Sequence, residues 1–210
     1  VNFKRKSTMN KRRVVITGLG IVSPVGNNVN DAWANIINGV SGIAPITNID
    51  TEIQAVKFGG AVKEFDVSQY LSPKEAKKMD IFIHYGMAAG IQAFEDSGIE
   101  VTDENAERIG VAIGAGIGGL TTIEKTADLF REKGPKRISP FFVPSSIINM
   151  VSGNMSIKFG LKGPNFAIVT ACTTGTHNIG DASRIIEYGD ADVMIAGGTE
   201  MSTTNCGLGG

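Results

Sequence analysis

The fold is decided by the stretch RIGVAIGAGIGGLTTIEKTADLFR, which occupies residues 108–131. Residues 108–114 are apolar from Ile109 onward and rich in β-branched side chains, which predicts a buried strand. A glycine-rich turn follows, and from Leu120 to Arg131 the pattern becomes that of a helix. A strand without polar alternation belongs to a sheet covered by helices on both faces. The stretch therefore predicts an α/β fold with a mostly parallel sheet.

The same alternation of strand and helix recurs along the chain. Apolar β-branched runs predict further strands at 13–18, 166–170 and 191–196. Residues 1–8 are basic, precede Met9 and lack the apolar segment of a secretory signal, so we expect them to be a leader outside the fold. We expect residues 9–210 to form one unit. Helices are predicted after an N-cap at Asn30, after a capping box at Ser72, and over 80–97, 145–159 and 173–188.

Composition excludes several classes of protein. The chain has 210 residues, 27 of them glycine, and a formal net charge of −1, which gives nucleic-acid binding no electrostatic support. The longest apolar stretch, about 81–94, is shorter than the ~20 residues that cross a bilayer, so we expect no membrane span. Two histidines and two cysteines, Cys172 and Cys206, are too few for a zinc cluster or a disulfide scaffold, so we expect no metal and a reducing compartment.

Cys172 is a candidate nucleophile. It lies where the predicted strand 166–170 turns into a helix, and the unpaired N–H groups and dipole of a helix N-terminus favour a thiolate. The small neighbour Ala171 would let a substrate approach closely. A buried structural cysteine is the alternative. His177 is five positions further, which turns its side chain about 140° away on a helix, and His84 is expected to be structural, so the chain offers no convincing base.

The turn from Gly114 to Gly119 satisfies the pattern G-x-G-x-x-G between a strand and a helix, which is typical of dinucleotide binding. Such a unit also needs an acidic residue at the end of a strand about 20 residues later. Residues 134–140 contain neither a strand pattern nor an acid. The turn is better explained by close packing of backbone against backbone or against a ligand.

Three lysines, Lys74, Lys77 and Lys78, have the spacing i, i+3 and i+4, which predicts one shared helix face. The resulting cationic patch is either an ordinary solvated surface or a dock for an acidic partner.

Residues 170–180, TACTTGTHNIG, closely resemble the β-ketoacyl-[acyl carrier protein] synthases, and within them the synthase II branch. Three further motifs occur in the same order as in that family: RVVITGLG at 13–20, SPFFVP at 139–144 and GDADVM at 189–194. Several separate motifs in the right order make the resemblance specific.

The resemblance implies a thiolase-like fold, in which two similar α/β halves pair within one chain and chains pair into homodimers. It implies a cytoplasmic acyltransferase of fatty acid synthesis without a cofactor. Cys172 would accept an acyl group from acyl carrier protein, and malonyl carrier protein would be decarboxylated and condensed with it. Ile117, Phe142 and Ala171 match substrate-binding positions, and the family's carrier-binding surface corresponds to Lys74, Lys77 and Lys78.

The family's two active-site histidines, a lysine and the second oxyanion-hole donor belong to a C-terminal half that these 210 residues do not contain. We therefore expect this chain alone to carry the nucleophile without completing the condensation, and to expose an apolar face. Two alternatives are a nucleotide-binding module that uses the Gly114–Gly119 turn and an inactive half that only dimerises.

Overall fold

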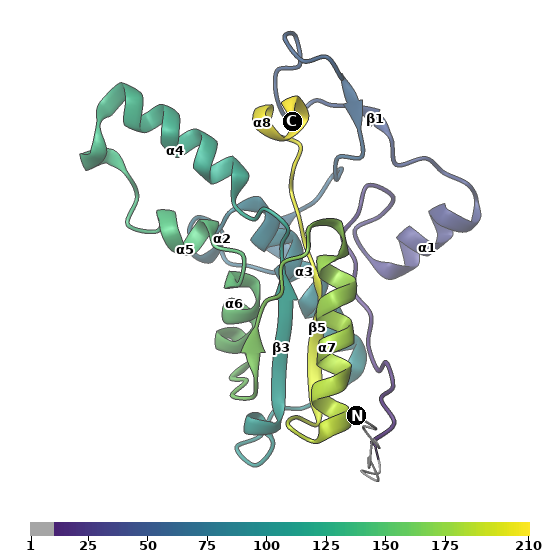
Figure 1. Ribbon diagram of the computed structural model, residues 1–210. Coiled ribbons are helices and arrows are strands. Elements are labelled where there is room, and N and C mark those ends of the chain that lie inside the picture. Colours follow the sequence, from purple (N-terminus) through teal and green to yellow (C-terminus); the bar gives the residue numbers. More distant parts are fainter. Residues whose placement is uncertain (1–10) are drawn as a thin grey trace, which may run out of the picture.

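The computed structural model describes residues 11–210, so the expected leader at 1–8 lies outside the described residues. Its centre is a three-stranded parallel sheet made by β3 (Ile109–Gly114), β4 (Asn165–Phe166) and β5 (Val193–Gly198), in the order β4-β3-β5 (Figure 1). β3 and β5 pair over their whole length, from Ile109 opposite Val193 to Gly114 opposite Gly198. The predicted parallel α/β sheet is confirmed.

Helices cover both faces of this sheet. α3 (Ile81–Ser97) and α6 (Met150–Phe159) pack on one face, and α7 (Thr174–Tyr188) packs on the other (Figure 1). β3 is buried along its whole length, which is why it reads as a continuous apolar run. The centre of the core consists of fully or almost fully buried side chains, namely Phe82, Ile83, Met87, Val111, Ile113, Val151 and Met155.

The remaining elements gather mainly beyond the carboxyl ends of the strands (Figure 1). These elements are α1 (Val29–Ile37), the antiparallel pair β1 (Ala44–Pro45) and β2 (Phe58–Gly59), α2 (Pro73–Ala76), α4 (Leu120–Lys133), α5 (Phe142–Ser146) and α8 (Asn205–Gly209), with short 3₁₀ turns at Val67–Gln69, Ala106–Arg108, Pro135–Arg137 and Ala171–Thr173. None of the helices in the described part of the chain is both long and apolar enough to cross a membrane.

Helix boundaries agree with the sequence signals where a cap is strong. Ser72 forms the predicted capping box with Glu75, and Gly98 ends α3 in the left-handed conformation. The predicted N-cap Asn30 is wrong by two residues, because the Asn28 side chain accepts the hydrogen bond from the backbone N–H of Asp31.

The single helix predicted over 145–159 is also wrong, since two helices, α5 and α6, occupy the region with a break at Ile147. The hydroxyl groups of Ser145 and Ser146 both donate to the carbonyl oxygen of Phe142, at 3.0 and 2.6 Å. Ile147 then adopts an extended conformation, with ψ of 142°. Side chains that bond back to the preceding turn favour such an interruption.

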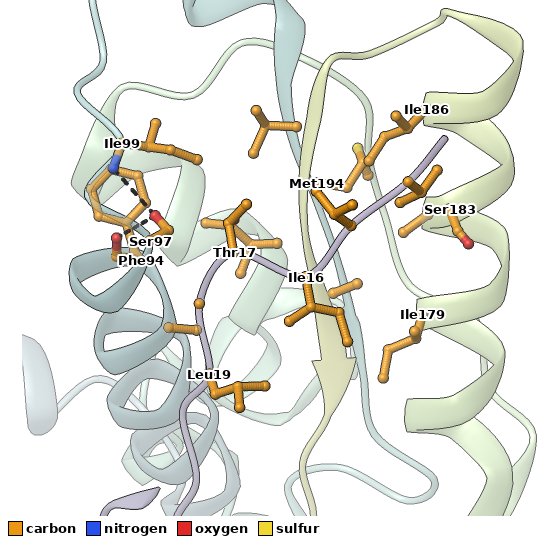
Figure 2. Close-up of a pocket in the computed structure, with 18 residues that line it drawn as sticks. Ile16, Thr17, Leu19, Phe94, Ser97, Ile99, Ile179, Ser183, Ile186 and Met194 are labelled. Carbon is orange, nitrogen blue, oxygen red and sulfur yellow. Dashed lines mark hydrogen bonds between the residues drawn. The ribbon is translucent and has the colours of Figure 1, made fainter. Parts of the chain in front are cut away.

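The strand predicted at 13–18 is an extended segment without a strand partner among residues 11–210. It runs past β5 on the side away from β3. An apolar cavity of about 400 Å³ separates this segment from β5 (Figure 2). α3 and α7 supply the other walls, through residues such as Phe94 and Ile186. The exposed fraction of Ile16 reaches 80%. This edge of the sheet therefore exposes apolar side chains.

Candidate functional site

Cys172 is the middle residue of the 3₁₀ turn Ala171–Thr173, and this turn directly precedes α7. Ala171 has a φ of 52°, a left-handed conformation that is uncommon for a residue with a side chain. The sharp turn leaves the Cys172 thiol exposed and free of any disulfide. The predicted position at a helix N-terminus is confirmed, and the alternative of a buried structural cysteine is wrong.

Asn178, which is completely buried, holds the segment that leads into this turn. Its side-chain oxygen accepts from the backbone N–H of Ile168 at 3.0 Å, and its side-chain nitrogen donates to the carbonyl oxygens of Ile168 and Thr174 at 3.1 and 2.9 Å. Of the strand predicted over 166–170, only Phe166 belongs to β4. The backbone N–H and carbonyl groups of Ile168 are hydrogen-bonded to the Asn178 side chain of α7 and not to a neighbouring strand. Asn178 was not among the residues predicted from the sequence, although a poor helix former inside a helix was an available signal.

The Gly114–Gly119 turn packs against the turn that contains Cys172. A Cβ atom added to Gly116 would lie 3.2 Å from the Ala171 Cα and 3.0 Å from Glu200 Oε2. A side chain at this position would require these neighbours to shift, so the glycine lets the two turns pack closely. The structure therefore brings Ala171 beside the turn that carries Ile117, a residue whose exposed fraction is 53%.

The backbone N–H groups of this turn are already hydrogen-bonded to a carboxylate. Ile117 donates to Glu200 Oε2 at 2.7 Å, and Gly118 donates to Glu200 Oε1 at 3.1 Å. A phosphate placed here would have to displace the carboxylate or meet its negative charge, which argues against the nucleotide-binding interpretation. Glu200 was missed by the sequence analysis, although an acidic residue directly after a buried strand was the available signal.

Phe142 is the first residue of α5 and is half-buried. α5 is tied to the same turn, because the Gly119 N–H donates to the carbonyl oxygen of Ser146 at 3.0 Å. Ile117 and Phe142 are thus carried by two segments that are directly bonded to each other.

The three lysines do not share one helix face as predicted, because α2 ends at Ala76 and only Lys74 lies within it. Lys77 is the C-cap residue, and Lys78 follows the helix and places its ammonium 4.9 Å from the centroid of the Phe141 ring. Lys74 and Lys77 are exposed. The cationic patch therefore extends from α2 to the residue that precedes α5.

Both histidines have local partners. His84 Nε2 lies 2.9 Å from the carbonyl oxygen of Ala76. His177 Nδ1 lies 3.4 Å from Thr170 Oγ1, and its Nε2 lies 3.6 Å from a carboxylate oxygen of Asp181. Within residues 11–210, neither histidine is hydrogen-bonded to Cys172.

Comparison with known proteins agrees with this arrangement. The family model of the β-ketoacyl synthase N-terminal domain matches residues 11–210. The chain belongs to the β-ketoacyl synthase family.

Relatives named 3-oxoacyl-[acyl-carrier-protein] synthase 2 include those of Vibrio cholerae, Coxiella burnetii and Staphylococcus aureus. The first two are 60% and 54% identical to this chain over 202 residues, which are 96% of this chain and 49% of each relative. The third is 48% identical over 199 residues, 95% of this chain and 48% of the relative. The chain spans about half the length of the curated relatives it matches.

Solved ketosynthase structures share the fold. "The ishigamide ketosynthase/chain length factor" superimposes with a TM-score of 0.84 at 24% sequence identity, over 94% of this chain and 49% of that one. A type II polyketide acyl-carrier protein in complex with its ketosynthase gives a TM-score of 0.80 at 24% identity, over 94% of this chain and 53% of that one. The thiolase-like fold expected from the resemblance is confirmed, and this chain holds about half of the duplicated architecture.

The two exposed cysteines of this synthase domain differ in their surroundings. The pKa of the Cys206 thiol is raised, because the Glu124 carboxylate holds the thiol proton by a hydrogen bond and repels the thiolate. The same carboxylate accepts from the Thr204 hydroxyl at 2.6 Å and from the Cys206 backbone N–H at 2.9 Å. These contacts disfavour the thiolate of Cys206, which is the reactive form of a cysteine.

Proposed function

We propose that this chain is the N-terminal half of a β-ketoacyl-[acyl carrier protein] synthase II and that Cys172 is its acyl acceptor in fatty acid elongation. The observation that carries the proposal is the exposed Cys172 thiol on a left-handed turn at the start of α7, beside the Ile117 turn. A reactive thiol at a helix N-terminus, next to an apolar side chain and a glycine-rich turn, is suited to accept an acyl group from a thioester.

The proposed chemistry has two stages. The Cys172 sulfur attacks the carbonyl carbon of an acyl thioester, the carbon–sulfur bond to the carrier breaks, and the carrier leaves as a thiol with the proton that Cys172 loses. A malonyl thioester then loses carbon dioxide, and the resulting carbanion attacks the acyl-cysteine carbonyl. The cysteine is released and protonated, and the product is longer by two carbons.

The backbone N–H of Cys172 is the proposed oxyanion donor. No acceptor for this N–H occurs in the described part of the chain, and the group lies in the turn that begins α7. A preorganised N–H at the site of a developing oxyanion stabilises a tetrahedral intermediate strongly.

Ile117, Phe142 and Ala171 are proposed to contact the acyl chain. Ala171 and the Ile117 turn are in direct contact through Gly116, and α5 brings Phe142 to the same turn. Phe142 is proposed to reach toward the acyl pocket of a second subunit in a homodimer.

Lys74, Lys77 and Lys78 are proposed to dock acyl carrier protein in its acyl and malonyl forms. The patch is cationic, and the Lys78 ammonium lies over the ring of Phe141, the residue before α5. One structural neighbour is described as an acyl-carrier protein in complex with its ketosynthase. The enzyme is proposed to act in the cytoplasm, where acyl carrier protein would meet it.

The groups that decarboxylate the malonyl thioester are proposed to lie outside these 210 residues, because both histidines of the chain have other partners. Cys172 acylation and condensation are therefore separable. This chain is expected to perform the first without the second.

The test is intact-mass spectrometry of the chain after incubation with an acyl thioester of the carrier protein. One acyl group is expected on Cys172, and Cys172→Ser is expected to abolish it, whereas the matched variant Cys206→Ser retains it. Adding malonyl carrier protein is expected to give no ketoacyl product. The proposal is wrong if the chain acquires no acyl group or if Cys172→Ser is acylated as fast as the unsubstituted chain.

A further inference from the structure

Glu200 makes an unusual contact for a residue outside the sequence-predicted site. Its two carboxylate oxygens accept hydrogen bonds from two consecutive backbone N–H groups, those of Ile117 at 2.7 Å and Gly118 at 3.1 Å. Hydrogen bonds to a charged acceptor are roughly twice as strong as neutral ones. Within the described residues, Glu200 is the only acceptor for these two N–H groups.

The backbone around Glu200 is firmly anchored. The preceding residue, Thr199, donates its N–H to the carbonyl oxygen of Gly114 at 3.0 Å and its hydroxyl to the carbonyl oxygen of Phe82 at 2.7 Å. The following residue, Met201, is buried in the main core. The carboxylate therefore extends from a fixed point at the end of β5.

The turn that Glu200 contacts has little conformational preference of its own. Gly116, Gly118 and Gly119 surround Ile117, and Gly118 adopts a φ of 88°. Glycine residues allow many backbone conformations, so such a turn needs external contacts to keep one of them. The bond from Gly119 to Ser146 fixes one end, and Glu200 fixes the residues before it.

This turn determines where two proposed acyl-contact residues lie. It carries Ile117 beside Ala171, and through Ser146 it is bonded to the helix that begins at Phe142. We propose that Glu200 is a positioning residue that fixes the Ile117 turn and so determines which acyl chain lengths reach Cys172. The second part of this proposal rests on the proposed acyl transfer to Cys172.

The first experiment tests the contact without any reaction. Amide hydrogen exchange is measured in the full chain and in Glu200→Gln and Glu200→Ala. We expect the amides of Ile117 and Gly118 to exchange about 10-fold faster or more in Glu200→Ala, with a smaller increase in Glu200→Gln, which keeps one acceptor oxygen.

Glu124→Gln is the matched control, because Glu124 also accepts from a backbone N–H and a hydroxyl, at Cys206 and Thr204. It is expected to leave exchange at Ile117 and Gly118 unchanged. Equal exchange at these two amides in the unsubstituted chain and in Glu200→Ala would overturn the proposal.

The second experiment compares the rates at which Cys172 is acylated by short and long acyl thioesters. In Glu200→Gln we expect the ratio of the two rates to change by about 5-fold or more, because a mobile Ile117 alters access for long chains more than for short ones. Glu124→Gln is expected to keep the ratio of the unsubstituted chain.

The remaining outcomes separate the two proposals. A uniform decrease for all chain lengths, with the ratio unchanged, would indicate a purely structural role and overturn the positioning proposal. If the unsubstituted chain is not acylated at all, the proposed function fails and the chain-length role of Glu200 fails with it. The exchange measurement would still decide whether Glu200 orders the turn.

Discussion

Gly175, in the first turn of α7, and Gly198, at the end of β5, are in direct backbone contact. A Cβ atom added to Gly198 would lie 2.8 Å from both the Cα and the N of Gly175. Real Cβ atoms do not approach a neighbour this closely. The helix that begins just after Cys172 therefore rests on the strand itself, with no side chain between them.

This contact predicts that Gly198→Ala displaces the start of α7. We expect a loss of about 1–3 kcal/mol in the free energy of unfolding and slower alkylation of Cys172, because the added methyl group has no space. Denaturant unfolding and iodoacetamide labelling followed by mass spectrometry would measure the two effects. Gly197→Ala is the control, since a Cβ there meets no atom within 4 Å. Equal effects of the two substitutions would contradict the interpretation.

Asp80 joins the first turns of two helices. It is 3% exposed, and its carboxylate accepts from the Phe82 N–H in α3 at 3.2 Å and from the Thr122 N–H in α4 at 2.7 Å. Asp80→Ala would leave both N–H groups without an acceptor, so we expect it to reduce the free energy of unfolding by about 2–4 kcal/mol.

The exposed Asp66 provides the control for this prediction. It accepts from the Ser68 N–H at 2.9 Å in the same local geometry, but within residues 11–210 it bridges to no second helix. Asp66→Ala is expected to cost less than about 1 kcal/mol in a urea titration. If both substitutions had the same effect, the bridge made by Asp80 would have no special importance.

Local signals were sufficient where the structure is determined locally. The capping box at Ser72, the closing Gly98 and the continuous apolar run of β3 each depend on residues within a few positions of one another. The strand predicted at 13–18 failed because a strand needs a neighbour, and no residue pattern within the segment shows whether one is present. What it faces in this structure is the apolar cavity beside β5.

The candidate site shows the same division. Cys172 was predicted to lie at a helix N-terminus from its position between an apolar run and a helix, and the structure agrees on that position. Glu200 was not predicted, because its hydrogen bonds to Ile117 and Gly118 join residues more than 80 positions apart. A carboxylate that binds distant backbone groups has no local sequence pattern.

The lysine patch predicts a dependence of carrier binding on charge and salt. Reversing Lys74 and Lys77 to Glu is expected to weaken binding of acyl carrier protein by about 10-fold or more at low salt, and the difference should shrink at high ionic strength. Surface plasmon resonance over a range of salt concentrations would measure it. The control reverses Lys133 and Lys136, which gives the same change in net charge at the far end of α4. Equal weakening by both pairs would indicate a general charge effect and no specific dock.

The raised pKa of Cys206 predicts how its labelling depends on pH. The thiolate is the reactive form, and the Glu124 carboxylate disfavours it, so labelling of Cys206 should increase only at higher pH than for an ordinary thiol. Glu124→Gln removes the negative charge and should move the labelling curve of Cys206 to lower pH. The labelling rate of Cys172 in the same samples serves as the internal control and should not change. An unshifted Cys206 curve would show that Glu124 does not control this thiol.

The cavity between residues 14–19 and β5 predicts binding of apolar dyes at a defined place (Figure 2). Its walls are mainly apolar, and Ile16, which is 80% exposed, lies at its edge. Exposed apolar surface of this kind promotes association, so we expect the chain to bind an anilinonaphthalene dye and to self-associate as its concentration rises. Ile16→Asp should lower both dye fluorescence and association, because a carboxylate at this edge opposes apolar contact. Ile53→Asp is the matched control, since Ile53 is 90% exposed but lies outside the cavity lining. If Ile53→Asp reduced both signals as much as Ile16→Asp, the association would come from general surface hydrophobicity and not from the open edge beside β5.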